Sequence, residues 1–106
     1  MKKGDIVLVP FPFTDLTGNK WRPALVLIST KTDVTVCFIT TRFLQDGDSD
    51  IPLKPSVSNG LKKESLLRLS KFATLDKDII PGKIGNLEPE YIRYLNKKLI
   101  EILQLQ

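Results

Sequence analysis

Arg22 is the residue whose type and position point most directly to chemistry. It lies between Trp21 and Pro23, immediately before the apolar run at residues 24–28. A residue that precedes proline is held in an extended backbone conformation, so the guanidinium of Arg22 starts from a restricted position. A planar guanidinium in a fixed pose can donate two parallel hydrogen bonds to a phosphate. The structural alternative is a salt bridge from Arg22 to Asp15 that closes the preceding loop.

The residue types that are missing narrow the chemistry further. The chain has no histidine and one cysteine, Cys37. This excludes histidine-ligated metal sites, histidine-dependent catalytic triads and an internal disulfide, and we expect neither a metal nor a cofactor. The neighbours of Cys37 are apolar, which predicts a core position rather than a reactive thiol.

Length and composition predict one globular domain spanning residues 1–106. The content of 42% hydrophobic and 26% charged residues is typical of soluble proteins. Because no apolar run is long enough for a membrane span or a signal sequence, we expect a cytoplasmic protein. The net charge of +4 favours an anionic partner such as nucleic acid, although a merely solvated basic surface would give the same value.

The pattern along the chain predicts a strand-rich fold closed by one helix. Pro52 limits its segment to an edge strand, and Pro89 suits the first turn of the helix. Apolar residues recur at helical spacing from Ile92 to Leu103. We therefore expect strands at 6–9, 24–28, 34–41, 51–53, 65–69 and 71–75, loops at 10–20 and 42–50, turns at 29–33 and 56–60, and a C-terminal helix that plugs one end of a small, strongly bent sheet or barrel.

Several short motifs together resemble one known family. Gly4-Asp5 stands about 17 residues before Arg22-Pro23-Ala24, and Ile39-Thr40-Thr41 ends the third expected strand. With Arg68-Leu69, the segment 74–77 and the segment 84–87, this pattern resembles the PemK/MazF family of toxin endoribonucleases over nearly the whole chain. The resemblance implies a mainly β, SH3-like barrel of strongly bent antiparallel sheet with a C-terminal helix. It also implies a homodimer, metal-independent cleavage of single-stranded RNA, and an antitoxin that occupies the RNA groove.

The resemblance also implies which residues react. The arginine of Arg-Pro and a threonine that closes the third strand form the family's catalytic pair, and here they correspond to Arg22 and Thr40. Thr41 is the neighbouring candidate, and alternation along a strand lets only one of the two threonines face the site. RNA supplies its own nucleophile, the 2′-hydroxyl, so the protein must supply in-line geometry and a counter-charge for the phosphorane. No general base is identifiable.

RNA contacts are expected from aromatic and cationic residues in or beside the two long loops. Phe13 and Phe43 stand among polar residues and are the better stacking candidates, whereas Phe11 and Trp21 fit the core equally well. Lys20 and Arg42 could contact phosphates or be solvated charges. The predicted RNA-binding residues are Phe13, Lys20, Trp21, Thr41, Arg42, Phe43 and Lys71. Ser70, Lys71 and Ala73 stand where many relatives carry Asp, Gln and Arg, which bears on RNA sequence preference.

Three functions compete. The first is a toxin endoribonuclease neutralised by an acidic antitoxin, whose carboxylates would lie near Arg22 and Lys20 and whose apolar side chains would cover Phe13 or Trp21. The second is a non-enzymatic toxin of the same fold that binds a protein target, as gyrase-poisoning toxins do. The third is a barrel that binds RNA without cutting it. Arg22-Pro23 together with Thr40-Thr41 favours the nuclease, because a binding module needs neither.

Overall fold

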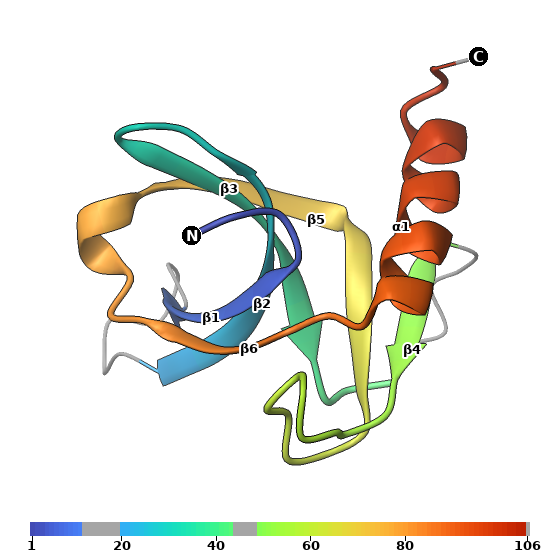
Figure 1. Cartoon of the computed structure of the whole chain (residues 1–106), viewed down its shortest axis with the longest axis horizontal. Coiled ribbons are helices and arrows are strands. Elements are labelled where there is room, and N and C mark those ends of the chain that lie inside the picture. The colour runs from blue at the N-terminus through green and yellow to red at the C-terminus, as the bar shows by residue number, and fades with distance from the viewer. Residues whose placement is uncertain (12–19, 44–48, 106) are drawn as a thin grey trace.

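A computed structural model describes residues 1–11, 20–43 and 49–105 of the chain (Figure 1). Strands dominate, and one α-helix follows them near the C-terminus. The elements are β1 (Asp5–Phe11), β2 (Lys20–Ser29), β3 (Asp33–Thr40), β4 (Asp50–Leu53), β5 (Ser65–Asp76), the 3₁₀ helix η1 (Lys77–Ile79), β6 (Lys83–Asn86) and α1 (Pro89–Ile102).

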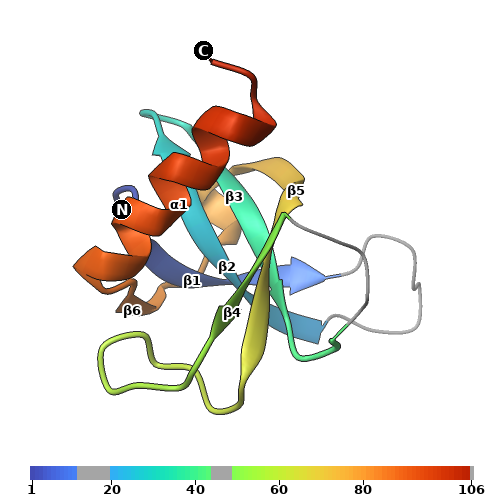
Figure 2. The ribbon, with the colours of Figure 1, turned by 90° about the vertical axis from the view of Figure 1, so that its right-hand side faces the viewer.

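The six strands form one antiparallel sheet in the order β4-β5-β3-β2-β1-β6. The sheet curls into a half-barrel, and α1 lies across one side of it (Figure 2). The expected fold class, a small bent antiparallel sheet with a C-terminal helix, is confirmed. Within the described part of the chain, no helix combines the length and the apolar character that a membrane crossing needs.

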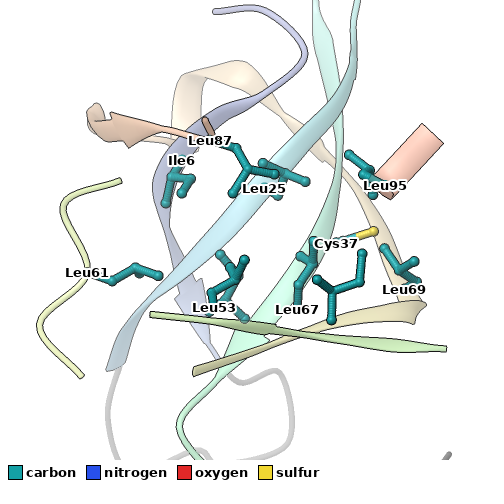
Figure 3. Close-up of a cluster of buried hydrophobic side chains, with 11 residues drawn as sticks. Ile6, Leu25, Cys37, Leu53, Leu61, Leu67, Leu69, Leu87 and Leu95 are labelled. Atoms are coloured by element: carbon teal, nitrogen blue, oxygen red, sulfur yellow. The ribbon is translucent and has the colours of Figure 1, made fainter. Parts of the chain in front are cut away.

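Two clusters of buried side chains pack on the two faces of the sheet. The helix-side cluster includes Leu95 of α1, which points toward Cys37 and its neighbours (Figure 3). Its buried members are Ile6, Leu25, Cys37, Ile39, Ile51, Leu53, Leu61, Leu67, Leu69, Leu87 and Leu95. The opposite cluster consists of Val7, Val9, Ala24, Val26, Val34, Val36 and Ile80, with Phe38 and Leu75 packed against it. We call the two sides of the sheet the helix-side face and the opposite face.

Strand β2 supplies side chains to both faces. Ala24, Leu25 and Val26 are all fully buried, which confirms the expectation of a strand covered on both sides. Ile28, in contrast, is 58% exposed, because an irregularity between Val26 and Ile28 lies near the end of the β2–β3 ladder. Pro10 and Lys20, assigned to a loop from sequence, belong to β1 and β2. Residues 12–19 lie outside the described ranges.

Strand β5 is one continuous strand, so the expectation of two separate strands at 65–69 and 71–75 was wrong. Cys37 of β3 pairs with Phe72, whereas the next residue, Phe38, pairs with Arg68. Residues 69–71 of β5 therefore have no pairing partner in β3, because they lie between the partners of two consecutive β3 residues. Such a bulge bends a strand while keeping it in the sheet, and the bend is visible in β5 (Figure 1).

Strand β6 was missed by the sequence reading because it is short and contains a glycine. Its Gly85 lies against the backbone of Ser58 and Asn59, and a Cβ at this position would overlap that backbone. The N–H of Asn86 donates to the carbonyl of Ser58 at 2.8 Å. Gly60 adopts a positive φ of 69° beside the carbonyl of Ile84. The backbone of the turn at 56–60 therefore packs directly against the backbone of β6, which the two glycines make possible.

The Gly4-Asp5 motif has a structural explanation. Gly4 has a φ of 96°, donates to the carbonyl of Val26 at 2.9 Å, and accepts from the N–H of Leu87 at 2.8 Å. The buried carboxylate of Asp5 accepts from the backbone N–H of Lys2 at 3.0 Å and lies 3.5 Å from Lys83 Nζ. These contacts join the start of the chain to β2, β6 and the approach to α1.

Candidate active site

Arg22 and Thr40 come together because β2 and β3 are antiparallel neighbours. Ala24 pairs with Phe38, and continuing that register by two residues brings Arg22 opposite Thr40. Residues that pair directly across two antiparallel strands point to the same side of the sheet. Arg22 and Thr40 both point to the side away from α1, which we named the opposite face. Arg22 also pairs with Val9 of β1. It therefore lies inside β2, not at a loop–strand junction as the sequence suggested.

Their side chains line a hollow of about 280 Å³, whose lining residues are Arg22, Phe38, Thr40 and Arg42. We call it the arginine hollow. Thr40 Oγ1 accepts a hydrogen bond of 3.1 Å from the N–H of Arg42, so a short turn after β3 holds the hydroxyl. The hydroxyl proton of Thr40 can then be donated elsewhere. Two guanidinium groups and one hydroxyl around one space suit an anionic ligand with several oxygen atoms.

A second hollow, of about 480 Å³, lies on the other face at the same end of the strands. We call it the tryptophan hollow. It is lined by Leu8, Trp21, Pro23, Thr41, Gly60, Leu61, Lys62, Lys63, Ser65 and Ile84. Trp21 precedes Arg22 and Thr41 follows Thr40, so alternation places these neighbours on opposite faces. The two threonines accordingly line different hollows.

The remaining candidates are placed less centrally. Lys20, Phe43 and Lys71 are exposed and line neither hollow. Lys71 lies in the bend of β5, and Phe43 follows Arg42 with 57% of its surface exposed. Phe13 and Asp15 lie outside the described residues, as does the side chain of Phe11. The alternative salt bridge between Arg22 and Asp15 is therefore a prediction without a structural counterpart here.

Sequence reasoning missed a third arginine as a site candidate. Arg68 of β5 pairs with Phe38, whose side chain lines the arginine hollow, and with Asp50 of β4. Its Nε lies 3.3 Å from Asp50 Oδ1, and both side chains are almost completely buried. A charged residue within the apolar stretch Leu66-Leu67-Arg68-Leu69 was the available signal, because arginine is rarely buried without a partner. Since opposed residues of an antiparallel pair point to the same side, Arg68 lies beside Phe38 on the face that carries the arginine hollow.

Cys37 is buried in the helix-side cluster, as expected. Burial raises the pKa of its thiol to about 12, because the thiolate would lose its hydration. The thiol is therefore not a nucleophile near neutral pH. Among the described residues, no group of three or more acidic, histidine or cysteine side chains could hold a metal ion.

Comparisons with known proteins place the chain in a family. Residues 2–103 match the family model described as "PemK-like, MazF-like toxin of type II toxin-antitoxin system". No curated protein matches the sequence.

Among solved structures, the fold is similar to the Mycobacterium tuberculosis toxin MazF-mt6, with a TM-score of 0.77 and 22% identity over 96% of this chain and 98% of that one. It is also similar to an endoribonuclease from a mycobacterial species solved with its cognate antitoxin, with a TM-score of 0.74 and 20% identity over 100% of this chain and 97% of that one. Family match, fold and motifs agree, and the chain belongs to the PemK-like, MazF-like toxins of type II toxin–antitoxin systems.

Proposed function

We propose that this toxin is an endoribonuclease that cleaves single-stranded RNA in the arginine hollow without a metal ion. The observation that carries the proposal is the convergence of Arg22, Thr40 and Arg42 on one hollow. The family assignment supports it, and a structurally similar protein is named an endoribonuclease. Arg22 and Thr40 are the proposed catalytic residues.

The proposed reaction uses the nucleophile that RNA carries. The 2′-oxygen forms a bond to the adjacent phosphorus, the bond from phosphorus to the 5′-oxygen breaks, and the products are a 2′,3′-cyclic phosphate and a 5′-hydroxyl. Arg22 stabilises the added charge on the phosphorane, and the hydroxyl of Thr40 donates to a phosphoryl oxygen. Among the residues that the structure describes, those lining the arginine hollow include no carboxylate. In this proposal, solvent water takes the proton of the 2′-hydroxyl and supplies the proton of the leaving 5′-oxygen.

RNA binding extends outward from the arginine hollow in this proposal. Arg42 contacts a flanking phosphate, and the exposed ring of Phe43 stacks on a base. Lys20 and Lys71 add cationic contacts along the RNA strand. Phe13 is expected to stack on a base. Trp21 and Thr41 line the tryptophan hollow instead, so their expected contact with RNA receives no support from the arginine hollow.

The proposed assembly is a cytoplasmic homodimer neutralised by an acidic antitoxin. Ile28 and Phe72 are 58% and 41% exposed, and their pairing with Thr35 and Cys37 puts both on the helix-side face. Leu103 and Leu105, just after α1, are also exposed. Exposed apolar side chains of this kind suit contact with a second copy of the chain. One similar structure is a complex with a cognate antitoxin.

The deciding experiment incubates the pure protein with end-labelled single-stranded RNA in excess EDTA. Discrete cuts that leave a cyclic phosphate support the proposal, provided that an all-deoxy oligonucleotide of the same sequence stays intact. The Arg22→Ala variant, purified identically, controls for contaminating nucleases. Retention of RNA without cuts would indicate an RNA-binding barrel. Neither cutting nor retention would indicate a toxin that acts on a protein.

A further inference from the structure

A row of paired residues crosses the sheet beside the proposed catalytic pair. Phe38 of β3 pairs with Ala24 of β2 on one side and with Arg68 of β5 on the other. Arg68 in turn pairs with Asp50 of β4. Since directly paired residues point to the same side of a sheet, all four side chains lie on the opposite face. The proposed catalytic pair forms the neighbouring row on that face.

The bulge in β5 puts Arg68 on this face. Arg68 and Phe72 are four positions apart, so strict alternation would place both on one side of the sheet. Instead, Phe72 pairs with Cys37, a member of the helix-side cluster, while Arg68 lies on the opposite face. The unpaired residues 69–71 between them shift the alternation by one position. The leucines on either side of Arg68 accordingly belong to the helix-side cluster (Figure 3).

The guanidinium of Arg68 is tethered to β4. Its Nε donates to Asp50 Oδ1 at 3.3 Å, and the two side chains are only 10% and 7% exposed. Within the described part of the chain, Asp50 Oδ2 is buried and accepts no hydrogen bond, so the charge of this carboxylate is balanced by Arg68. A long side chain that is held at its charged end has a fixed course, and the aliphatic stem of Arg68 therefore stays beside Phe38.

Phe38 needs such a neighbour because the residue on its other side is small. Ala24 offers a single methyl group beside the ring, whereas Arg68 offers a long aliphatic stem. Phe38 lines the arginine hollow together with the proposed catalytic pair. A sideways shift of its ring would change the space that holds the guanidinium of Arg22 and the reacting phosphate. Misplacement of reacting groups by about 1 Å can lower a rate roughly a hundredfold.

We propose that Arg68, tethered by Asp50, is a positioning residue for the reaction in the arginine hollow. Its stem holds the ring of Phe38, and the ring fixes the space available to Arg22 and the phosphate. The inference rests on the proposed function, because it adds a residue to the machinery of the proposed ribonuclease. Arg68 is not among the lining residues of the hollow, so it acts on the rate of the chemical step and not on RNA affinity.

Three variants separate positioning from stability. Arg68→Met keeps an unbranched stem and removes the tether, whereas Arg68→Lys keeps a cation for Asp50. The double variant Asp50→Asn/Arg68→Met lacks the tether but leaves no buried carboxylate without its partner. We expect kcat to fall roughly tenfold or more in Arg68→Met and in the double variant, and to stay near the wild-type value in Arg68→Lys. Urea denaturation should show that the double variant is more stable than Arg68→Met, although its kcat is no higher.

The matched control is Leu69→Ala, at the neighbouring position on the helix-side face. It should lose stability and keep the wild-type kcat. Single-turnover cleavage at saturating RNA gives the rate, and titration with a 2′-O-methyl oligonucleotide, which cannot be cut, gives the affinity. Affinity should be unchanged in every variant. The inference is overturned if Arg68→Met cuts at the wild-type rate, if Arg68→Lys or Leu69→Ala is equally slow, if the double variant regains rate together with stability, or if weaker RNA binding explains the loss.

Fluorine NMR gives a readout that does not depend on RNA. In protein labelled with para-fluorophenylalanine, the variant Phe38→Leu identifies the signal of Phe38. We expect this signal to be the same in the wild type, Arg68→Lys and Leu69→Ala, and to shift and broaden in Arg68→Met and the double variant. An unchanged signal in Arg68→Met would overturn the inference. A wild-type protein that leaves RNA intact would refute the proposed function, and the fluorine signals would then decide on their own whether Arg68 positions Phe38.

Discussion

The arginine hollow and the tryptophan hollow are built from the same strands and differ in almost every chemical respect. Arg22 and Thr40 line one, and their sequence neighbours Trp21 and Thr41 line the other. The first concentrates guanidinium groups around a small space, whereas the second offers an apolar floor with ammonium groups at the rim. The period of two along a β-strand thus lets one dipeptide serve two unlike surfaces.

The two hollows also differ in what supports them. Beside Phe38, which lines the arginine hollow, lies the buried ion pair of Arg68 and Asp50, which links β5 to β4. Under the tryptophan hollow, the support is the turn at 56–60, held by hydrogen bonds to the Asn59 side chain. Substitutions at the two hollows should therefore affect the reaction differently.

The largest effect is expected from Arg22→Ala. Removing the group that stabilises the phosphorane should lower the cleavage rate on the order of a hundredfold or more. Arg22→Lys should restore little, because an ammonium cannot replace the bidentate guanidinium. Trp21→Ala, one residue away on the other face, should lose far less. Single-turnover cleavage assays, with thermal unfolding to verify the fold, measure the contrast. If the cleavage rate falls by a similar factor in the Trp21 and Arg22 variants, the assignment of catalysis to the arginine hollow alone is contradicted.

A smaller loss is expected from Thr40→Val, which keeps the β-branched shape and deletes the hydroxyl. A neutral donor contributes less than a charged one, so the rate should fall roughly tenfold to a hundredfold. Thr41→Val is the matched variant for the other hollow and should be milder. If Thr41→Val proves the more damaging of the two, the catalytic role moves to Thr41 and the proposed face is wrong.

Asp50→Asn tests the buried ion pair beside the arginine hollow. Weakening the partner of a buried arginine should lower the free energy of unfolding by about 1–3 kcal/mol. Urea denaturation measures this change. Asp33→Asn, at an exposed position of the β3 start, should stay within about 0.5 kcal/mol of wild type. Equal stability of the two variants would mean that the pair of Arg68 and Asp50 contributes nothing measurable.

The smallest effect concerns Cys37 in the helix-side cluster. Its pKa is raised from 9.0 to about 12, so above about pH 9 the unfolded chain releases the thiol proton more readily than the folded one. Stability should therefore fall with rising pH, by up to about 1.4 kcal/mol per pH unit from this group. Urea denaturation at several alkaline pH values, compared with Cys37→Val, isolates the contribution. A slope that is identical in the two proteins would contradict the assignment.

Much of this arrangement was predictable from local patterns. Helix α1, the buried run of β2 and the core position of Cys37 follow from periodicity and apolar neighbours. The convergence of Arg22 and Thr40 needed the β2–β3 register, which the resemblance implied and composition could not. Strand β6 and the bend of β5 depend on contacts with residues distant in sequence, so local patterns did not reveal them. Arg68 escaped because its partner, Asp50, lies on another strand.

The strand order has a consequence for folding of the chain during its synthesis. Strand β1 pairs on one side with β2, which follows it closely, and on the other with β6, which is made more than sixty positions later. Ile84 of β6 lines the tryptophan hollow, and Leu95 of α1 completes the helix-side cluster. A nascent chain on the ribosome can therefore form the β2–β3 hairpin early but cannot finish its fold until synthesis has passed α1. A toxin with this topology acquires its full shape only after α1 has been synthesised.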